Sequence, residues 1–468
     1  MRLTLKQFAA GFMLTAACYS CKTLKPVAPE SAAADIPKIV QPVSTIDVPV
    51  SVDMKSYIVQ AENSVPTKFA DSQQPCGGLR YSYTFTRTPF TITGSNNVVN
   101  LKFTGGYGIS ASYCAKCADL FGNGPQCIVP VLSAQCGMGG EAPRRMEIAY
   151  QSTISVLPNY YLKSKTILYP DPKPIDRCNI VFGSIDVTDR LVGYLKAPLN
   201  NLGAVVDAKI ATFSLKPMFD QLWKSMSDEF KAGDVGFLNV NPQSVCLSSF
   251  SLNGSVLNFS VGLTAKPVVT LVSNRQPAAP LPALSNYTPA NGFNIYLDLL
   301  ENYDHLNNVV NQQVSGQTIK VAGNEFIVDN VKIYGIGSKI AMMVDFGGTT
   351  SGTIYLVATP TYDTATHLLS FPDLTFDLQT RAWMLKTAKW MFNGAITEAI
   401  KKRATYNCSK FIADSKKNIE SQMSRTFDNG IHSDVTISNL DIMQIYPTAE
   451  KLIVRTLSTG QIKVQMKM

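Results

Sequence analysis

The chain has 468 residues, of which 45% are hydrophobic and 16% charged, and its net charge at pH 7 is +8. This balance allows two sizeable buried cores and excludes a chain dominated by disorder. Beyond the N-terminus, no stretch approaches the roughly 18 uninterrupted apolar residues of a spanning helix, which excludes such a helix from the body of the protein.

The first 17 residues have the pattern of a lipoprotein-type secretory signal peptide. Arg2 and Lys6 precede a short apolar segment, and three small residues at 15–17 come directly before Cys18. Small residues let a signal peptidase reach the bond, and a cysteine thiol can carry diacylglycerol. We expect Cys18 to be a lipid anchor, with Cys21 as second choice. The alternative is an ordinary signal peptide with an incidental cysteine.

Export and anchoring predict a location in the bacterial cell envelope, on the periplasmic face or at the cell surface. Residues 18–42, rich in Pro and Ala, have the composition of a tether. The positive charge favours contact with anionic headgroups or acidic polymers. Most Lys and Arg residues are dispersed, however, which is typical of solvated surfaces. Nucleic acid is not an expected partner of an exported protein.

The first predicted module covers residues 43–275. In chain order we expect a strand over 46–53, a short helix over 56–69, antiparallel strands over 79–86, 90–93, 98–104, 108–113, 145–157 and 160–168, a helical region over 188–230, and strands over 245–251, 256–263 and 268–272. Pro198 and Pro217 should break or kink the helical region.

A cysteine-rich insertion at about 114–136 interrupts this module. Its cysteines are Cys114, Cys117, Cys127 and Cys136. Four thiolates can close a tetrahedral zinc site, but the second half of this segment lacks the paired spacing of a zinc knuckle. Outside the cytoplasm, disulfides that stabilise a loop are the favoured interpretation, and their connectivity cannot be read from spacing.

A Pro-rich linker is expected over 276–292, and a second module over 293–468 repeats the order of the first. We expect a strand and short helix over 293–314, strands over 326–334, 339–346, 352–359 and 367–378, a helical region over 380–427, and strands over 434–445 and 451–466. Short sequence echoes support a duplication. The run at 48–57 is similar to the run at 293–303. The runs at 90–94 and 101–106 are similar to those at 331–335 and 343–348.

These elements predict an α+β fold of two tandem modules, each a long, strongly curved antiparallel sheet wrapped around a long helix. Such a wrap leaves an apolar channel where side chains do not fill it. The candidate lining residues lie on the helical stripes: Leu195, Leu202, Val206, Trp223, Met226, Met391, Phe392 and Ile396. A fully packed core is the alternative for each of them.

Four segments carry a resemblance to a known family: Asp176-Arg177-Cys178, the run from Gly183 to Arg190, Pro280-Leu281-Pro282, and the run from Thr359 to Asp363. In these the chain resembles a family of bacterial envelope lipoproteins described only as domain of unknown function 4403. The order of its elements is similar to that of the tubular lipid-binding superfamily, which includes the bactericidal permeability-increasing proteins. That second resemblance implies acyl chains held between helix and sheet.

The sequence contains no recognisable catalytic, cofactor or metal motif, so we expect neither an enzyme nor a cofactor. Asp186 and Asp189 could form an acid/base pair, but their place before a helix favours a role at the helix start. Arg144 and Arg145 could contact a phosphate headgroup, although ion pairs at a loop exit are the simpler interpretation.

We therefore expect a non-enzymatic envelope lipoprotein that binds or transfers a lipid or other amphiphile in an apolar channel. The alternative is a structural protein with packed modules that binds an envelope partner or a polysaccharide through exposed strand edges. A hydrolase that uses Asp186 or Asp189 is a third, less favoured reading. The oligomeric state is left open.

Overall fold

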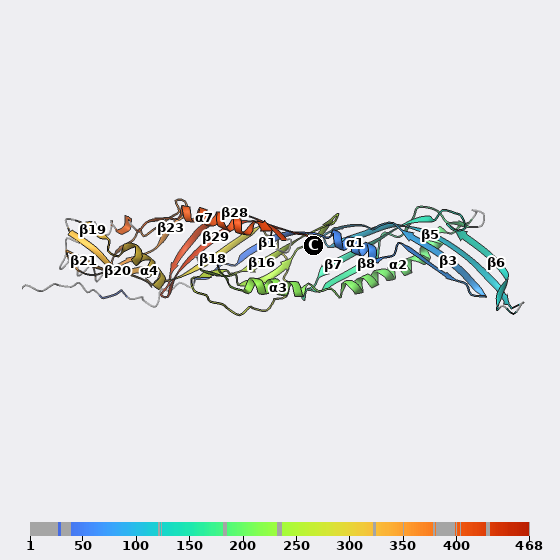
Figure 1. Cartoon of the computed structure of the whole chain (residues 1–468), viewed down its shortest axis with the longest axis horizontal. Coiled ribbons are helices and arrows are strands. Elements are labelled where there is room, and N and C mark those ends of the chain that lie inside the picture. The colour runs from blue at the N-terminus through green and yellow to red at the C-terminus, as the bar shows by residue number, and fades with distance from the viewer. Residues whose placement is uncertain are drawn as a thin grey trace, which may run out of the picture.

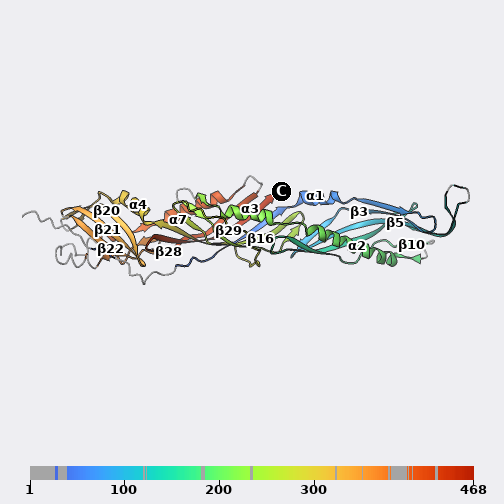
Figure 2. The same cartoon turned by 90° about the horizontal axis from the view of Figure 1, so that it is seen from below.

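The structure is a computed structural model that describes residues 27–29, 39–119, 122, 124–180, 185–231, 236–321, 324–349, 351–377, 380, 398, 400–402, 404–426 and 431–467. It is a mixed α+β protein in which strands predominate, and its largest sheet curls into a half-barrel. Figures 1 and 2 show an elongated molecule, and Figure 1 shows β6 (Gln126–Cys136) towards one end and β20 (Asn324–Ile336) towards the other.

The first half contains the predicted antiparallel meander. Its long strands β2 (Lys68–Gln73), β3 (Gly78–Arg87), β5 (Val98–Ala118), β7 (Arg144–Val156) and β8 (Leu162–Leu168) lie side by side in that order. β4 (Thr91–Ser95) and β6 continue the pairing at the two ends of β5, and β9 (Lys173–Pro174) pairs with β7.

The two strands expected over 98–104 and 108–113 are one continuous strand, β5. The glycines between them do not end the strand, because they allow a close approach from the neighbouring strand. A Cβ atom at Gly105 would lie 2.5 Å from ring carbons of Phe85. Glycine therefore lets this aromatic ring lie directly on β5.

β1 (Ser44–Asp53) joins both halves into one sheet. It pairs along its length with β16 (Val256–Ala265), and at its two ends with β18 (Phe293–Asn302) and β29 (Lys451–Lys467). β18 and β28 (Ile431–Pro447) both pair with β29. Shorter strands complete this sheet: β12 (Phe230–Lys231), β13 (Phe237–Asn239), β14 (Pro242–Leu247), β15 (Ser251–Asn253), β17 (Val268–Thr270) and β27 (Arg425–Thr426). This sheet contains strands from both sides of residue 292, so a division of the chain into two modules stays a prediction.

A separate five-stranded sheet forms the far end of the second half. Its strands are β19 (Thr318–Val321), β20, β21 (Lys339–Gly348), β22 (Gly352–Ala358) and β25 (Thr375–Phe376). Phe326, Phe346 and Leu356 are at the centre of its core. Two small sheets remain: β10 (Asn179–Ile180) with β11 (Ile185–Asp186), and β24 (Leu368–Ser370) with β23 (Thr361–Asp363) and β26 (Tyr406–Asn407).

Five helices can be given bounds within the described residues: α1 (Lys55–Ser64), α2 (Thr188–Ile210), α3 (Lys216–Ser227), α4 (Tyr303–Val314) and α7 (Ser409–Met423). The helical region expected over 188–230 is thus two helices. It continues through Pro198 and is interrupted only at 211–215, and Pro217 lies in the first turn of α3. None of the helices described has the length and apolar character needed to cross a membrane.

The single helical region expected over 380–427 is also interrupted, because β26 precedes α7. Residues 381–397 lie outside the described part of the chain. The first pair of sequence echoes does correspond to like elements, since β1 leads into α1 and β18 leads into α4. The second pair falls on the hairpins β4–β5 and β20–β21.

A buried ion pair ties the end of the predicted tether to the centre of the large sheet. Arg455 of β29 donates two hydrogen bonds of 2.7 and 2.8 Å to the Asp298 carboxylate of β18, and both residues are buried. The same guanidinium donates to the carbonyl of Val40, and the Gln41 amide donates to the carbonyls of Pro267 and Tyr296. Residues 40 and 41 are therefore fixed to the middle of the elongated molecule.

Replacing Asp298 by Ala would leave Arg455 buried without its anion, and we expect the free energy of unfolding to fall by about 3 to 5 kcal/mol. Urea denaturation followed by circular dichroism measures this change. The double variant Asp298→Leu with Arg455→Met removes both charges and should recover most of the loss. An Asp298→Ala protein as stable as the wild type would contradict a paired, desolvated charge.

Candidate functional site

The cysteine-rich segment is held by disulfides. The pairs are Cys76–Cys117, Cys114–Cys127 and Cys136–Cys178. The disulfide interpretation is confirmed, and two of the four cysteines of the segment have partners outside it. Nowhere in the described residues do three His, Cys, Asp or Glu side chains come together as metal ligands. Three disulfides indicate an extracytoplasmic location.

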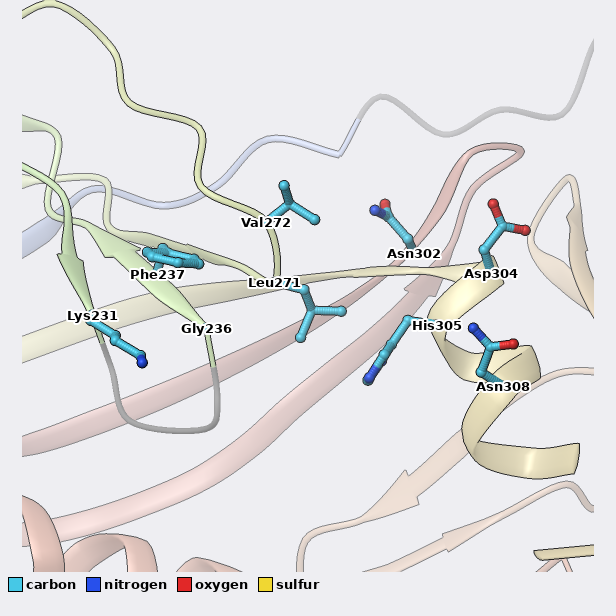
Figure 3. Close-up of a pocket in the computed structure, with 9 residues that line it drawn as sticks. All are labelled: Lys231, Gly236, Phe237, Leu271, Val272, Asn302, Asp304, His305 and Asn308. Atoms are coloured by element: carbon cyan, nitrogen blue, oxygen red, sulfur yellow. The ribbon is translucent and has the colours of Figure 1, made fainter. Parts of the chain in front are cut away.

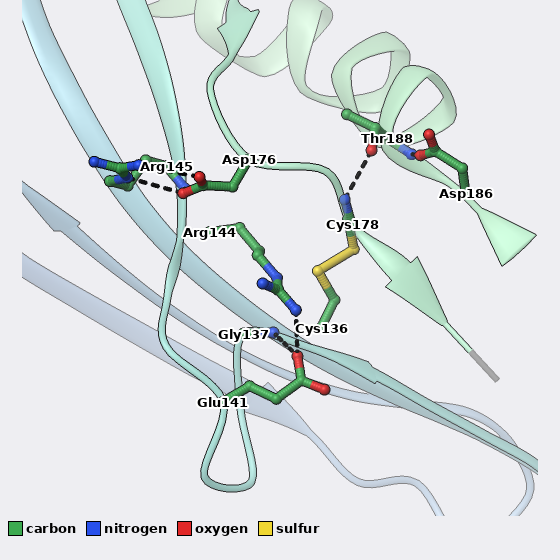
Figure 4. Close-up of a disulfide and its surroundings, with 9 residues drawn as sticks. All are labelled: Cys136, Gly137, Glu141, Arg144, Arg145, Asp176, Cys178, Asp186 and Thr188. Carbon is green, nitrogen blue, oxygen red and sulfur yellow. Dashed lines mark hydrogen bonds and ion pairs between the residues drawn. A yellow bond between two sulfur atoms is a disulfide. The ribbon is translucent and has the colours of Figure 1, made fainter. Parts of the chain in front are cut away.

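The acidic and basic candidates near this segment form local pairs (Figure 4). Asp186 accepts a hydrogen bond of 2.9 Å from the Thr188 backbone at the start of α2, and it also pairs with Arg177. The bonds from Thr188, followed by the charge of Arg177, hold the pKa of Asp186 below its usual value. This geometry fits the expected role at the helix start. Arg144 and Arg145 pair with Glu141 and Asp176, as the simpler interpretation predicted.

The first-half sheet has an apolar inner face, which we define as the face that packs against α2. Side chains alternate along each strand, so odd positions of β3 and β5 and even positions of β7 and β8 share this face. Met146, Ile148 and Leu168 are buried there together with Val192 of α2. The opposite face carries polar side chains such as the ion-paired Lys102 and Glu147.

Much of the inner face away from α2 is not covered. Leu101, Phe103, Phe85, Phe90 and Ile92 are only half-buried, whereas Phe69 and Tyr83 remain 40% and 38% exposed. The rings contact one another, with centroids 5.5 Å apart for Phe90 and Phe103 and 6.1 Å apart for Phe69 and Phe85. A filled core would bury such side chains.

α2 is attached along one flank, to the edge strand β8. Asp207 accepts three hydrogen bonds, from the Ser164 hydroxyl and from the Thr166 backbone and hydroxyl, at 2.6 to 2.9 Å. Gly203 lies so close to β8 that a Cβ atom there would be 2.7 Å from the Thr166 carbonyl. On the same flank Lys196 pairs with Asp171, beyond the end of β8.

A second flank of α2, turned away from Asp207 and Gly203 by the helical repeat, is apolar. It carries Leu195, Leu202 and Val206, three of the predicted lining residues. Leu195 packs partly against the buried cluster, whereas Leu202 and Val206 are 54% and 45% exposed. The structure thus brings these three together on one flank, which is uncovered at Leu202 and Val206. On the sheet, the alternation of aromatic and polar residues along β3 was the overlooked sequence signal for an apolar face.

Trp223 and Met226 belong to a different cluster, on α3. Trp223 is buried, and its indole N–H donates to the carbonyl of Ala279 over 2.9 Å. Leu281 and Leu284 pack in the same cluster, so the Pro-rich segment lies against α3. The predicted lining residues Met391, Phe392 and Ile396, and the predicted anchors Cys18 and Cys21, lie outside the described residues.

A separate pocket of about 510 Å³, lined by both polar and apolar residues, lies between the end of β17 and the start of α4 (Figure 3). Asn302, Asp304 and His305 line one side, and Phe237 and Leu271 line the other. The His305 ring contacts the carboxylate of Glu301, a buried residue. None of the residues that line this pocket is among the predicted lining residues of the channel.

Comparisons with known proteins give a family match and distant structural likenesses. A family model described as Domain of unknown function (DUF4403) matches residues 42–466. A crystal structure of lipopolysaccharide binding protein is 10% identical, with a TM-score of 0.26, and the match covers 91% of this chain and 99% of that chain. The structure of P47 from Clostridium botulinum A2 is 12% identical, with a TM-score of 0.22, and the match covers 90% of this chain and 96% of that chain.

Comparison with curated proteins gives no match. At these TM-scores, neither structural likeness carries an argument about what this chain binds. What the chain binds therefore has to be inferred from its own residues.

Burial alone would raise the pKa of Asp207, but its hydrogen bonds from Ser164 and Thr166 outweigh this and hold the pKa below its usual value. Its stabilising effect is therefore complete above the unfolded pKa of about 3.9 and is lost as the pH falls through the lower, folded value. Asp207→Asn should cost about 2 kcal/mol at pH 7 and remove part of this acid sensitivity.

Denaturation measured from pH 7 down to pH 2 would test the role of Asp207. Asp189→Asn, on the same helix but without contacts to β8, should cost only about 0.5 kcal/mol. Equal losses for the two variants would contradict the attachment of α2 through Asp207.

Proposed function

We propose that this chain, which belongs to the family described as Domain of unknown function (DUF4403), binds the acyl chain of a lipid or related amphiphile on its inner face. The ligand would lie between the apolar flank of α2 and the uncovered side chains of β3, β4 and β5. The proposed activity is binding or transfer of this amphiphile, without catalysis of a reaction.

The observation that carries the proposal is the incomplete cover of the inner face. Leu202 and Val206 on the helix, and Phe69 and Tyr83 on the sheet, leave more than a third of their surfaces in water. Monomeric proteins seldom expose many large apolar side chains on one face without a partner for them. Covering this surface with an acyl chain gains about 0.8 kcal/mol for each methylene removed from water.

The length of the uncovered flank supports a single acyl chain. Leu195 and Val206 are eleven residues apart within α2, and at 1.5 Å per residue that separation is about 16 Å. One leaflet of a bilayer's hydrocarbon core is roughly 15 Å thick. The flank could therefore cover one chain along its length.

Attachment to a membrane is the second part of the proposal. Cys18 would carry the lipid anchor, and residues 18–42 would link it to the centre of the molecule, where Val40 and Gln41 are fixed. This places the inner face within reach of the envelope membrane from which an amphiphile would come. The disulfides support export, which such a role needs.

The proposal predicts that residues 39–468, expressed with export and purified without detergent, retain lipid. Organic extracts analysed by mass spectrometry should contain about one acyl chain per protein molecule. A protein that carries no lipid and takes up none from vesicles would contradict the proposal. It would favour the alternative of a structural protein that binds an envelope partner through its surface.

A matched pair of variants locates the ligand. Leu202→Asp places a carboxylate on the apolar flank, where an acyl chain would have to desolvate it, and should reduce the retained lipid by about tenfold or more. Asn201→Asp puts the same side chain on the neighbouring exposed position of α2 and should leave the lipid content unchanged. Both variants should unfold within about 0.5 kcal/mol of the wild type. Equal lipid content in the two would contradict a ligand on this flank.

A further inference from the structure

We infer that the polar end of the amphiphile is an oxygen acceptor, a carboxylate or an ester carbonyl, and that it binds Tyr107 and Arg144 near the start of α2. This inference rests on the proposed function, because it concerns the same inner face. It adds the class of headgroup and the residues that recognise it.

Two buried donors on the inner face lack an acceptor. The Tyr107 hydroxyl and the Arg144 Nε are both shielded from solvent, and neither has a hydrogen-bond partner among the described residues. Tyr107 as a whole is only 7% exposed. The two residues are directly opposite each other in the β5–β7 ladder, so their side chains point to the same face. A buried donor without an acceptor is unfavourable and favours a ligand that supplies one.

The surroundings fix the position of the Arg144 side chain. Its terminal nitrogen donates to Glu141 over 2.8 Å, and the same carboxylate oxygen accepts from the Gly137 backbone over 3.1 Å. Figure 4 shows this guanidinium beside the Cys136–Cys178 disulfide, whose sulfur atoms belong to the buried cluster of the inner face. Arg144 is therefore held with its Nε inside the protein rather than in solvent.

The local charges favour a single acceptor oxygen over a multiply charged headgroup. Arg144, Arg145 and Arg177 are already paired with Glu141, Asp176 and Asp186. The nearby start of α2 adds the positive end of a helix dipole, which favours a partial negative charge. Burial, opposed in part by Arg144, raises the pKa of Tyr107, so its hydroxyl remains a donor at neutral pH.

The position of the two donors at one end of the inner face also predicts the orientation of the ligand. Tyr107 belongs to the buried cluster, and partly buried Leu191 and Leu195 of α2 pack against that cluster. An acceptor would reach the two donors by displacing the side chains of these two partly buried leucines. The acyl chain would then extend past Phe103 towards Leu202.

The test uses the full chain and a fluorescent fatty acid as probe. Hexadecanoic acid, its methyl ester and hexadecane compete for the probe, and they share one acyl length but differ in the acceptor. On the wild-type protein, the acid and the ester should each compete about tenfold better than hexadecane. Either order of acid and ester supports the inference and tells a carboxylate from a carbonyl.

The variants remove one donor at a time. Tyr107→Phe and Arg144→Lys should each reduce the advantage over hexadecane by about threefold to tenfold, whereas the exposed controls Tyr406→Phe and Arg145→Lys should keep it. If all three competitors bind and neither variant changes the advantage of the acid and the ester over hexadecane, the inferred role of the two donors is wrong and the proposed function still holds. If the wild-type protein binds neither the probe nor any of the competitors, the proposed function itself is wrong.

A stability measurement gives an independent readout. Without ligand, Tyr107→Phe removes a hydroxyl that has no partner, so its urea midpoint should equal or exceed that of the wild type. A lower midpoint would show that the protein already satisfies this hydroxyl, and it would overturn the inference.

Discussion

The attachment of α2 along one flank is the constraint on which the rest of the account depends. Asp207 binds Ser164 and Thr166, and Gly203 allows the helix to approach the backbone of β8 closely. These contacts hold the last turns of the helix against the edge strand, whereas its first turns pack on the buried cluster of β5 and β7. The apolar flank with Leu202 therefore remains free, and the inner face between α2 and β4 keeps its side chains half in water.

A sheet with one partly uncovered apolar face needs other sources of rigidity, and three can be seen in the described part of the chain. Disulfides hold the long β5–β6 hairpin and connect β6 to the segment before α2. The buried Arg87 ties the end of α1 to β3 through hydrogen bonds to the carbonyls of Glu62, Val65 and Pro66. The Asp298–Arg455 pair fixes the central strands and the end of the tether. An open inner face can therefore persist on a stable frame.

The sequence predicted local elements well and long-range relations poorly. Alternation identified the meander of β3, β5, β7 and β8, and the apolar stripe identified Leu195, Leu202 and Val206 as one set. The pairing of β1 with β16, β18 and β29 could not be read, because its partners lie more than 200 residues away. Disulfide partners such as Cys76 and Cys178 were equally hidden, since spacing does not give connectivity. The sequence also could not show which apolar residues stay uncovered, because that depends on where α2 attaches to the sheet.

Photo-crosslinking with a fatty acid that carries a diazirine in its acyl chain tests the central claim most directly. After irradiation and proteolysis, mass spectrometry locates each adduct on the sequence. We expect adducts on the α2 flank around Leu195 and Leu202 and on β5 around Leu101 and Phe103, and an excess of unlabelled acid should suppress them. Adducts confined to α3 or to the sheet of β20, β21 and β22, or adducts that excess acid does not suppress, would contradict an acyl chain bound on the inner face.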